Sequence, residues 1–164
     1  MRTLITGIAG FTGIHLSEYL LSQDRENDNI DLYGLDTVRN VSKEAQPILD
    51  KAKVFTSNIL DEEEMKKTLA EIKPDRIFHL AGLTFDPNSY QSPENFYIIN
   101  VFGTINLLEA VKQVGISPLI HIACSSAEYG LILENENPIR ETNHFRPISP
   151  YAISKLAQDM VGKG

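Results

Sequence analysis

The sequence predicts an α/β protein built on a Rossmann-like, doubly wound parallel sheet. Short apolar runs alternate with longer helical patterns along almost the whole chain, which is typical of βαβ units. A glycine-rich turn also joins the first strand pattern to the first helix pattern. The expected strands cover residues 3–6, 30–35, 53–56, 76–80 and 119–123. The expected helices cover residues 12–22, 61–72, 93–114 and 150–161, with a weaker one near residues 42–51.

Short sequence patterns support several of these helices and strands individually. Asp61, followed by Glu64 three residues later, predicts a capping box at the start of the helix 61–72. Residues 77–80 are apolar at nearly every position, as expected of a strand buried on both faces. Gly115 follows the helix 93–114 as a C-terminal glycine. Residues 131–150 are polar, contain three prolines and lack a clear period, so we expect a functional loop there.

Composition excludes several classes of protein. The 164 residues, 42% of them hydrophobic, suit one domain with a real core. The single cysteine, Cys124, excludes an internal disulfide or a cysteine zinc site, and we expect it to be a small core residue. A net charge of −7 disfavours a nucleic-acid partner, and the apolar runs are too short to span a membrane. The N-terminal residues lack a signal-peptide pattern, so we expect a cytoplasmic protein.

The glycine turn between the first strand and the first helix predicts a dinucleotide site. It reads G-x-x-G-x-x-G and has the strand–loop–helix context that this motif requires. Glycines let the backbone approach a diphosphate, and the N–H groups at the helix start face its negative charge. The residues expected to bind the cofactor here are Gly7, Gly10, Phe11, Thr12 and Gly13.

An acidic residue at the tip of the second strand bears on the choice between NAD and NADP. Asp36 can accept hydrogen bonds from the adenosine ribose hydroxyls, which favours NAD. Arg39 lies nearby and offers a partner for a 2′-phosphate instead. The sequence therefore predicts NAD or NADP as the cofactor, with NAD favoured by Asp36.

The start of the last helix carries a tyrosine and a lysine four residues apart. This spacing places Tyr151 and Lys155 on one helical face. Tyrosine normally loses its proton near pH 10, too high for a general base at neutral pH. A lysine ammonium one turn away favours the phenolate and brings its pKa toward working pH. The pair is therefore a candidate for proton transfer.

Taken together, these motifs resemble the extended short-chain dehydrogenase/reductases, the NAD-dependent epimerase/dehydratase family that modifies nucleotide sugars. The similarity covers nearly the whole chain and is strongest to GDP-mannose 4,6-dehydratases, with the reductases of their 4-keto product almost as similar. The matching segments are Thr6-Gly7-x-x-Gly10-Phe11-x-Gly13, His79-Leu80-Ala81-Gly82, Asn100-Val101-x-Gly103-Thr104, Ser125-Ser126-Ala127-Glu128-Tyr129-Gly130 and Ser149-Pro150-Tyr151-Ala152-x-Ser154-Lys155.

The resemblance implies roles for individual residues. Tyr151 would take the proton of the sugar 4-hydroxyl, which Ser126 would hydrogen-bond, while Lys155 would hold the nicotinamide ribose. Glu128 matches the carboxylate that removes the hydrogen on C5, so that water leaves from C6. The remaining positions implied to bind the cofactor are Asn58, Ile59, Leu80, Ala81 and Gly82. Asn58 replaces a more common aspartate, but its amide oxygen can still accept a hydrogen bond from the adenine amino group.

Two departures from the family pattern affect what we expect of the active site. Glu128 is followed directly by Tyr129, where the family has an apolar residue between them, and this deletion would re-aim the carboxylate. Ala127 stands where glucose-type 4,6-dehydratases carry an aspartic acid, which argues against that subgroup.

Length is a third departure. Family members are roughly twice this long, so residues 1–164 are expected to form an NAD(P)-binding Rossmann domain that is incomplete at its C-terminal end, without the substrate domain. We therefore expect cofactor binding without efficient turnover, or one half of a split enzyme.

Other functions remain open from the sequence. The enzymatic alternatives to a GDP-mannose-like 4,6-dehydratase, a lyase, are a nucleotide-sugar epimerase and a 4-keto-6-deoxy-sugar reductase. From a different class comes a non-catalytic dinucleotide-binding module. The resemblance also implies a possible homodimer through the central and Tyr-Lys helices. His79 fits a packed strand histidine and a direct role at the site equally well. Asn100 fits a helix-packing hydrogen bond, and the resemblance implies that it shapes the backbone near the site; no metal ligands are expected.

Overall fold

The computed structural model describes residues 1–23, 30–37, 41, 43, 45–84 and 87–163. The chain divides into two compact units. The first unit contains Met1–Ala81 and Asn106–Ala123, and the second contains Gly82–Ile105 and the chain from Cys124 onward.

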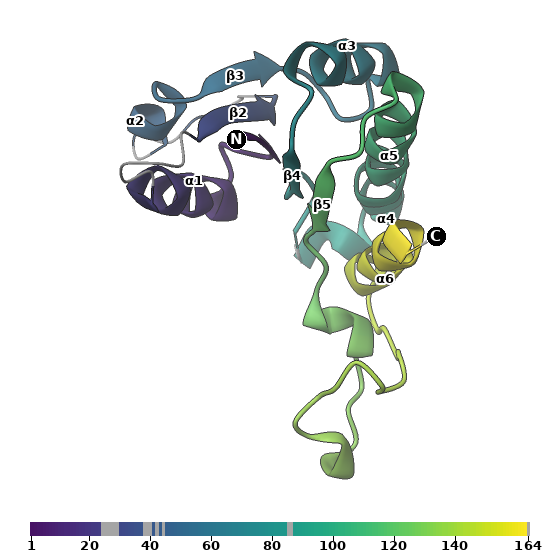
Figure 1. Ribbon diagram of the computed structural model, residues 1–164. Helices are drawn as coiled ribbons and strands as arrows, with labels where there is room; N and C mark the ends of the chain where they lie inside the picture. The colour runs from purple at the N-terminus through teal and green to yellow at the C-terminus, as the bar shows by residue number, and fades with distance from the viewer. Residues whose placement is uncertain (24–29, 38–40, 42, 44, 85–86, 164) are drawn as a thin grey trace. The chain divides into compact units, whose positions relative to one another are not determined.

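The first unit is built on a five-stranded parallel sheet with the strand order β3-β2-β1-β4-β5 (Figure 1). The strands are β1 (Arg2–Thr6), β2 (Asp31–Asp36), β3 (Lys53–Thr56), β4 (Arg76–His79) and β5 (Leu119–Ile122). They agree with the five expected strands to within one residue at each end. The order reverses direction at β1, which confirms the doubly wound, Rossmann-like class.

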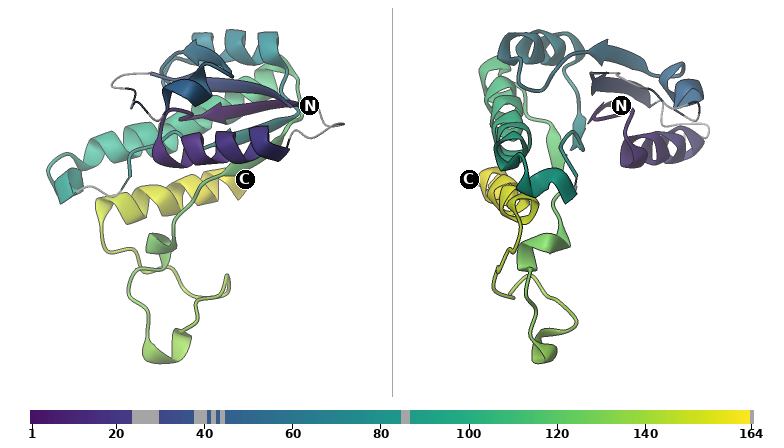
Figure 2. Two further views of the ribbon diagram at one scale, coloured as in Figure 1. Left: turned by 90° about the vertical axis from the view of Figure 1, so that its left-hand side faces the viewer. Right: turned by 180° about the vertical axis from the view of Figure 1, so that it is seen from behind.

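Helices cover both faces of this sheet. They are α1 (Phe11–Gln23), α2 (Gln46–Leu49), α3 (Glu62–Ile72) and α5 (Gly103–Val114), whose first residues belong to the second unit. Helices α1 and α2 lie on one face of the sheet, and α3 and α5 lie on the other, as Figures 1 and 2 show. The weak helix expected near residues 42–51 is reduced to α2, and Ser42 lies outside the described residues.

The core of this unit follows from the alternation of apolar residues along these elements. Ile5 and Ile8 are fully buried together with Leu32, and leucines of α1 pack against them. On α3, Met65 and Leu69 have no exposed surface, which matches its amphipathic pattern. The sheet is therefore buried by side chains that the sequence places with the expected period.

The glycine at the end of α5 is confirmed, and at the start of α3 the structure shows the Asp61 half of the expected capping box. The Asp61 side chain precedes α3 and accepts a hydrogen bond of 3.0 Å from the Glu64 N–H. Gly115 follows α5 with a φ of 73°, and its N–H donates to the Val111 carbonyl at 3.2 Å. A left-handed residue of this kind satisfies the last carbonyls of a helix.

The second unit is helical. Its elements are η1 (Pro87–Tyr90), α4 (Pro93–Phe96), η2 (Tyr97–Phe102), the start of α5, η3 (Ser126–Tyr129), η4 (Glu134–Glu136) and α6 (Pro150–Lys163). The single helix expected over 93–114 is a continuous run of α4, the π-helical η2 and α5. Helix α6 begins where the Ser149 hydroxyl accepts the Ala152 N–H at 3.1 Å and contacts η1, α4, η2 and η3.

One expectation about burial is wrong. Cys124 is exposed rather than a core residue. It follows β5, which is the last strand of the sheet that the described residues form, and Leu119 at the start of that strand is also exposed. Within the described residues, no helix combines the length and the apolar character that crossing a membrane requires.

The Asp61 cap gives a stability prediction. We expect Asp61→Ala to lower the free energy of unfolding by about 1 kcal/mol, since it removes the acceptor for an N–H at the start of α3. Urea denaturation measures the change. Asp61→Asn is the matched control, because it keeps a side-chain acceptor and should cost much less. An equal loss in both variants would contradict a capping role.

Candidate functional site

The candidate residues divide between the two units, so they form two groups. The positions expected to bind the cofactor in the first unit are Gly7, Gly10, Phe11, Thr12, Gly13, Asp36, Asn58, Ile59, Leu80 and Ala81. The second unit holds Gly82 and the four positions expected to be catalytic, which are Ser126, Glu128, Tyr151 and Lys155.

The glycine turn leaves β1 at the centre of the sheet, where the strand order reverses. Gly7 has a φ of 74°, and a Cβ added there would lie 2.8 Å from the Ala81 nitrogen. A Cβ at Gly13 would lie 2.3 Å from the Gly7 carbonyl oxygen. Side chains are therefore excluded at both positions, and the backbone folds closely upon itself.

The start of α1 presents the groups that a diphosphate needs. Phe11 is 80% exposed, and Thr12 is also exposed. The first N–H groups of a helix have no partners within the helix, and they carry its positive dipole end. A glycine cradle that leads into such a helix fits the diphosphate of a dinucleotide.

Asp36 lies against this turn. It is the last residue of β2, and its Oδ2 accepts a hydrogen bond of 3.0 Å from the Ala9 N–H. The carboxylate is therefore next to the glycine loop, in the position from which an acid binds the adenosine ribose in dinucleotide-binding folds. Arg39, the alternative partner for a 2′-phosphate, lies outside the described residues.

A buried hydrogen-bond chain joins the carboxyl ends of β1 and β4. The Thr6 hydroxyl lies 2.7 Å from His79 Nδ1 and accepts the Ala81 N–H at 3.2 Å. The Leu80 N–H donates to the Thr6 carbonyl at 3.1 Å. His79 is fully buried and is thus a packed strand residue. Sequence reasoning included Thr6 in the matching glycine segment but did not name it as a site residue, although its place at the end of a buried strand, just before the glycines, was the available signal.

Asn58 and Ile59 follow β3 and are held by local hydrogen bonds. Asn58 Oδ1 accepts the Leu60 N–H at 3.0 Å, so its amide oxygen already has one partner. An amide oxygen has two lone pairs, and one acceptor position therefore remains. Ile59 is buried, and its carbonyl accepts a hydrogen bond from Asn106 Nδ2 at 3.3 Å.

In the second unit, α6 carries Tyr151 and Lys155 one turn apart. Lys155 is only 7% exposed, and burial lowers the pKa of its ammonium. Its Nζ donates to Gln158 Oε1 at 2.7 Å. The Tyr151 ring is half-buried with its centroid 6.2 Å from that of Phe96, in an edge-on contact.

The short helix η3 packs against α6 and supplies Ser126 and Glu128. Ser126 is exposed. Glu128 is 4% exposed, and its Oε1 accepts the Ser125 N–H at 2.8 Å, which completes a capping box. Burial raises the pKa of Glu128, and the hydrogen bond from the Ser125 N–H opposes this most, with smaller contributions from Lys163 and Lys155. The structure thus brings Glu128 close to the Tyr-Lys helix, with one oxygen engaged by the backbone.

Cys124, just before η3, is a poor nucleophile. Burial of its sulfur and the nearby Asp159 carboxylate raise the pKa of the Cys124 thiol to about 11. The thiolate is the reactive form of cysteine. Cys124 is therefore protonated at neutral pH, although it is exposed.

Asn100 acts as the packed polar residue that we expected. Its Oδ1 accepts the Leu83 N–H at 2.7 Å, and its Nδ2 donates to the Leu83 carbonyl at 3.1 Å and to Ser154 Oγ at 2.9 Å. Gly82 lies directly against this amide. Asn100 thus ties the segment that follows Gly82 to α6.

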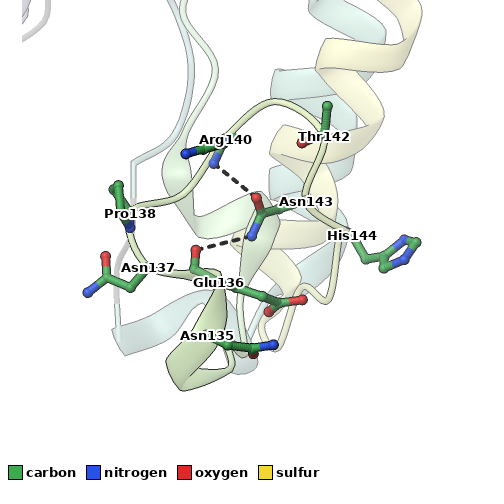
Figure 3. A pocket seen from close by; sticks show the side chains of 8 residues that line it. All are labelled: Asn135, Glu136, Asn137, Pro138, Arg140, Thr142, Asn143 and His144. Carbon is green, nitrogen blue, oxygen red and sulfur yellow. Dashed lines mark hydrogen bonds between the residues drawn. The ribbon is translucent and has the colours of Figure 1, made fainter.

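The polar loop expected at residues 131–150 encloses a pocket of about 490 Å³ (Figure 3). Asn143 bridges the loop, since its Oδ1 accepts the Arg140 N–H at 3.0 Å and its Nδ2 donates to the Glu136 carbonyl at 3.3 Å. Arg146 stabilises the same loop by donating two hydrogen bonds to the Glu136 carboxylate. Among the residues that the structure describes, no cluster of histidine, cysteine or acidic side chains is arranged to hold a metal.

Comparisons with known proteins agree with this arrangement. The family model described as GDP-mannose 4,6 dehydratase matches residues 4–163. A GDP-mannose 4,6-dehydratase of Vibrio cholerae is 33% identical over 93% of this chain and 42% of its own length. A UDP-glucose 4-epimerase of Mycolicibacterium smegmatis is 33% identical over 98% of this chain and 50% of its own length.

A crystal structure of Thermus thermophilus UDP-glucose 4-epimerase in complex with NAD has the same fold. It superimposes with a TM-score of 0.84 at 32% identity, covering 99% of this chain and 50% of the epimerase. The chain thus spans about half the length of the relatives it matches. With a family match over almost every residue and a parallel sheet of the expected order, the chain belongs to the GDP-mannose 4,6 dehydratase family, within the extended short-chain dehydrogenase/reductases that act on nucleotide sugars.

Proposed function

We propose that this chain binds NAD and supplies the proton-transfer residues of an enzyme that oxidises a nucleotide sugar at C4. The observation that carries the proposal is the Tyr151 and Lys155 pair on α6, with the lysine ammonium buried one turn from the phenol. This arrangement places a phenol hydroxyl and an ammonium side by side on one helical face, where they can act on the same sugar hydroxyl.

Each residue has a defined task in this reaction. Tyr151 takes the proton of the 4-hydroxyl, and Ser126 hydrogen-bonds the same oxygen from η3. Lys155 holds the nicotinamide ribose. When bound, NAD would supply the hydride acceptor for the hydrogen on C4. The glycine turn and the start of α1 hold the diphosphate, and Asp36 faces the adenosine ribose. Residues 58–59 and 80–82 border the same cofactor.

A 4,6-dehydratase acting on a GDP-mannose-like substrate is the first candidate for the complete reaction. It requires a carboxylate to remove the hydrogen on C5 after oxidation at C4, because the 4-ketone acidifies that position. Glu128 is buried beside the Tyr-Lys helix, and its pKa is raised, as suits a general base. The similarity to the Vibrio cholerae dehydratase supports this candidate.

A nucleotide-sugar epimerase or a 4-keto-sugar reductase is the second candidate. Neither reaction needs Glu128 as a base, and its Oε1 is already engaged by the Ser125 N–H in the capping box. The similarity to the Mycolicibacterium smegmatis epimerase supports this candidate. Two further expectations stay predictions. One is a homodimer through the central helix (residues 93–114) and the Tyr-Lys helix α6, and the other is inefficient turnover by this chain.

Calorimetric titration tests the cofactor proposal. We expect the chain to bind NAD, and Gly13→Val to weaken binding about tenfold or more, since a loss of about 1.4 kcal/mol already has that effect. Gly115→Ala is the matched control, because it changes a glycine outside the turn and should leave the affinity unchanged. No heat of binding by the unaltered chain would overturn the proposal.

Asp36 provides a test of cofactor choice. We expect NAD to bind more tightly than NADP, because a carboxylate repels a 2′-phosphate. Asp36→Asn keeps an acceptor for the Ala9 N–H but removes the charge. It should therefore reduce the ratio of the NAD affinity to the NADP affinity by about tenfold. Competition titrations with both cofactors measure this ratio. An unchanged preference would show that Asp36 does not select the cofactor.

Burial of Glu128 predicts a pH-dependent stability change. The pKa of this carboxyl is raised in the folded state, so folding disfavours its ionised form and stability falls as pH rises above the ordinary glutamate value. Glu128→Gln should therefore be more stable than the parent chain at pH 7 to 8, and the difference should vanish below about pH 4. Thermal unfolding across pH gives the comparison. A gain in stability that is independent of pH would be inconsistent with this cause.

The same variant separates the two candidates for activity. If Glu128 is the base at C5, Glu128→Gln in a full-length version that includes the substrate domain abolishes loss of water from GDP-mannose, while reduction of a 4-keto sugar survives. Mass spectrometry detects the loss of water, and oxidation of the reduced cofactor reports the reduction. A non-catalytic module would bind NAD and show neither reaction.

A further inference from the structure

Gln158 is a buried residue whose side chain the proposed reaction does not yet use. It lies on α6, three residues beyond Lys155, and has no exposed surface. Its Oε1 accepts a hydrogen bond of 2.7 Å from Lys155 Nζ. A lysine ammonium only donates hydrogen bonds, so the atom that faces it must be the amide oxygen.

Thr104 fixes the other end of this amide. Gln158 Nε2 donates to Thr104 Oγ1 at 2.8 Å, and the Thr104 hydroxyl donates to the Asn100 carbonyl at 2.7 Å. The Thr104 hydroxyl thus donates its hydrogen to that carbonyl and accepts the bond from Nε2. Rotation of the amide would break the bonds at both ends. The orientation of Gln158 is therefore determined by its two neighbours.

The same network reaches the tyrosine of the pair. Asn100 Nδ2 donates to Ser154 Oγ at 2.9 Å, and Ser154 Oγ contacts the Tyr151 carbonyl at 2.7 Å. The α6 members of the network are Tyr151, Ser154, Lys155 and Gln158, which share one face of the helix. The network thus connects the backbone at Tyr151 with the ammonium of Lys155.

The buried ammonium of Lys155 requires a hydrogen-bond acceptor in place of water, and Gln158 provides one. Burial alone disfavours the ammonium and lowers the pKa of Lys155. In this unit, the titratable groups from outside α6 that act on Lys155 are Glu128 of η3 and Cys124, and both favour the charged form. Cys124 is protonated at neutral pH, so its contribution is small there. The carbonyl oxygen of Gln158 is bonded directly to the ammonium.

We propose that Gln158 is a positioning residue that holds the Lys155 ammonium in place and in its protonated form, and that Thr104 fixes the Gln158 amide for this purpose. This proposal depends on the proposed function in one respect only, which is that the Lys155 ammonium would hold the nicotinamide ribose. A purely structural Gln158 would contribute to packing and leave the protonation of Lys155 unchanged.

Lysine-selective ¹³C and ¹⁵N NMR titrations of the whole chain test the proposal without cofactor. The Lys155 signal is assigned by its loss in Lys155→Arg. Gln158→Met removes the acceptor and should lower the pKa of Lys155 by about one unit. Gln158→Glu places a carboxylate there and should raise it. Gln113→Met on α5 is the matched control and should leave the pKa of Lys155 unchanged.

Opposite shifts in the two Gln158 variants support the proposal, and any other pattern overturns it. Should Gln158→Met fail to fold, Gln158→Glu is compared with Thr104→Val, which frees the amide and should also lower the pKa, while Thr104→Ser restores it. NAD titration of the same variants is a separate readout. If the parent chain binds no NAD, the proposed function fails, and the NMR shifts still decide the role of Gln158.

Discussion

The central position of β1 is the constraint on which the first unit depends. β1 pairs with β2 on one side and with β4 on the other, so the segments that follow these three strands meet at one edge of the sheet. The Thr6 hydroxyl then bonds the segment after β4, and Gly7 leaves room for the Ala81 backbone. The glycine turn is therefore shaped by strand pairing before any ligand is present. A diphosphate gains from this, because binding requires little reorganisation of the backbone.

In the second unit, the corresponding constraint is the burial of a charged side chain on α6. An ammonium removed from water is tolerated when other groups replace its hydration. Gln158 replaces part of it, while Asn100 and Ser154 satisfy the neighbouring backbone and side-chain groups. The bonds that hold α6 against η2 therefore also limit where the ammonium can lie. Stability and site geometry depend here on the same polar residues, and a substitution in the network changes both.

Sequence reasoning predicted the strands and most helix ends because those features depend on local chemistry. Buried strands are apolar at consecutive positions, and Asp61 and Gly115 act within one turn of their own helices. The exposure of Cys124 was not predictable in this way, since it depends on β5 being the last strand of the sheet that the described residues form. The π-helical geometry of η2 and the bond from Lys155 to Gln158 also leave no distinct pattern, because both look like an ordinary amphipathic helix. The catalytic candidates came from motif resemblance rather than from spacing alone.

The burial of Glu128 bears on the choice between the two candidate reactions. A cap on η3 requires only one hydrogen-bond acceptor, and a neutral amide would supply it without the cost of removing a carboxylate from water. The chain nevertheless has an acid there, 4% exposed, with one oxygen on the Ser125 N–H. A carboxylate has two oxygens, so the cap leaves the second able to accept a proton. A destabilising group beside a Tyr-Lys pair is typical of an active site. Burial of an acid where an amide would suffice for the cap therefore makes Glu128 the residue whose substitution separates the two proposed reactions.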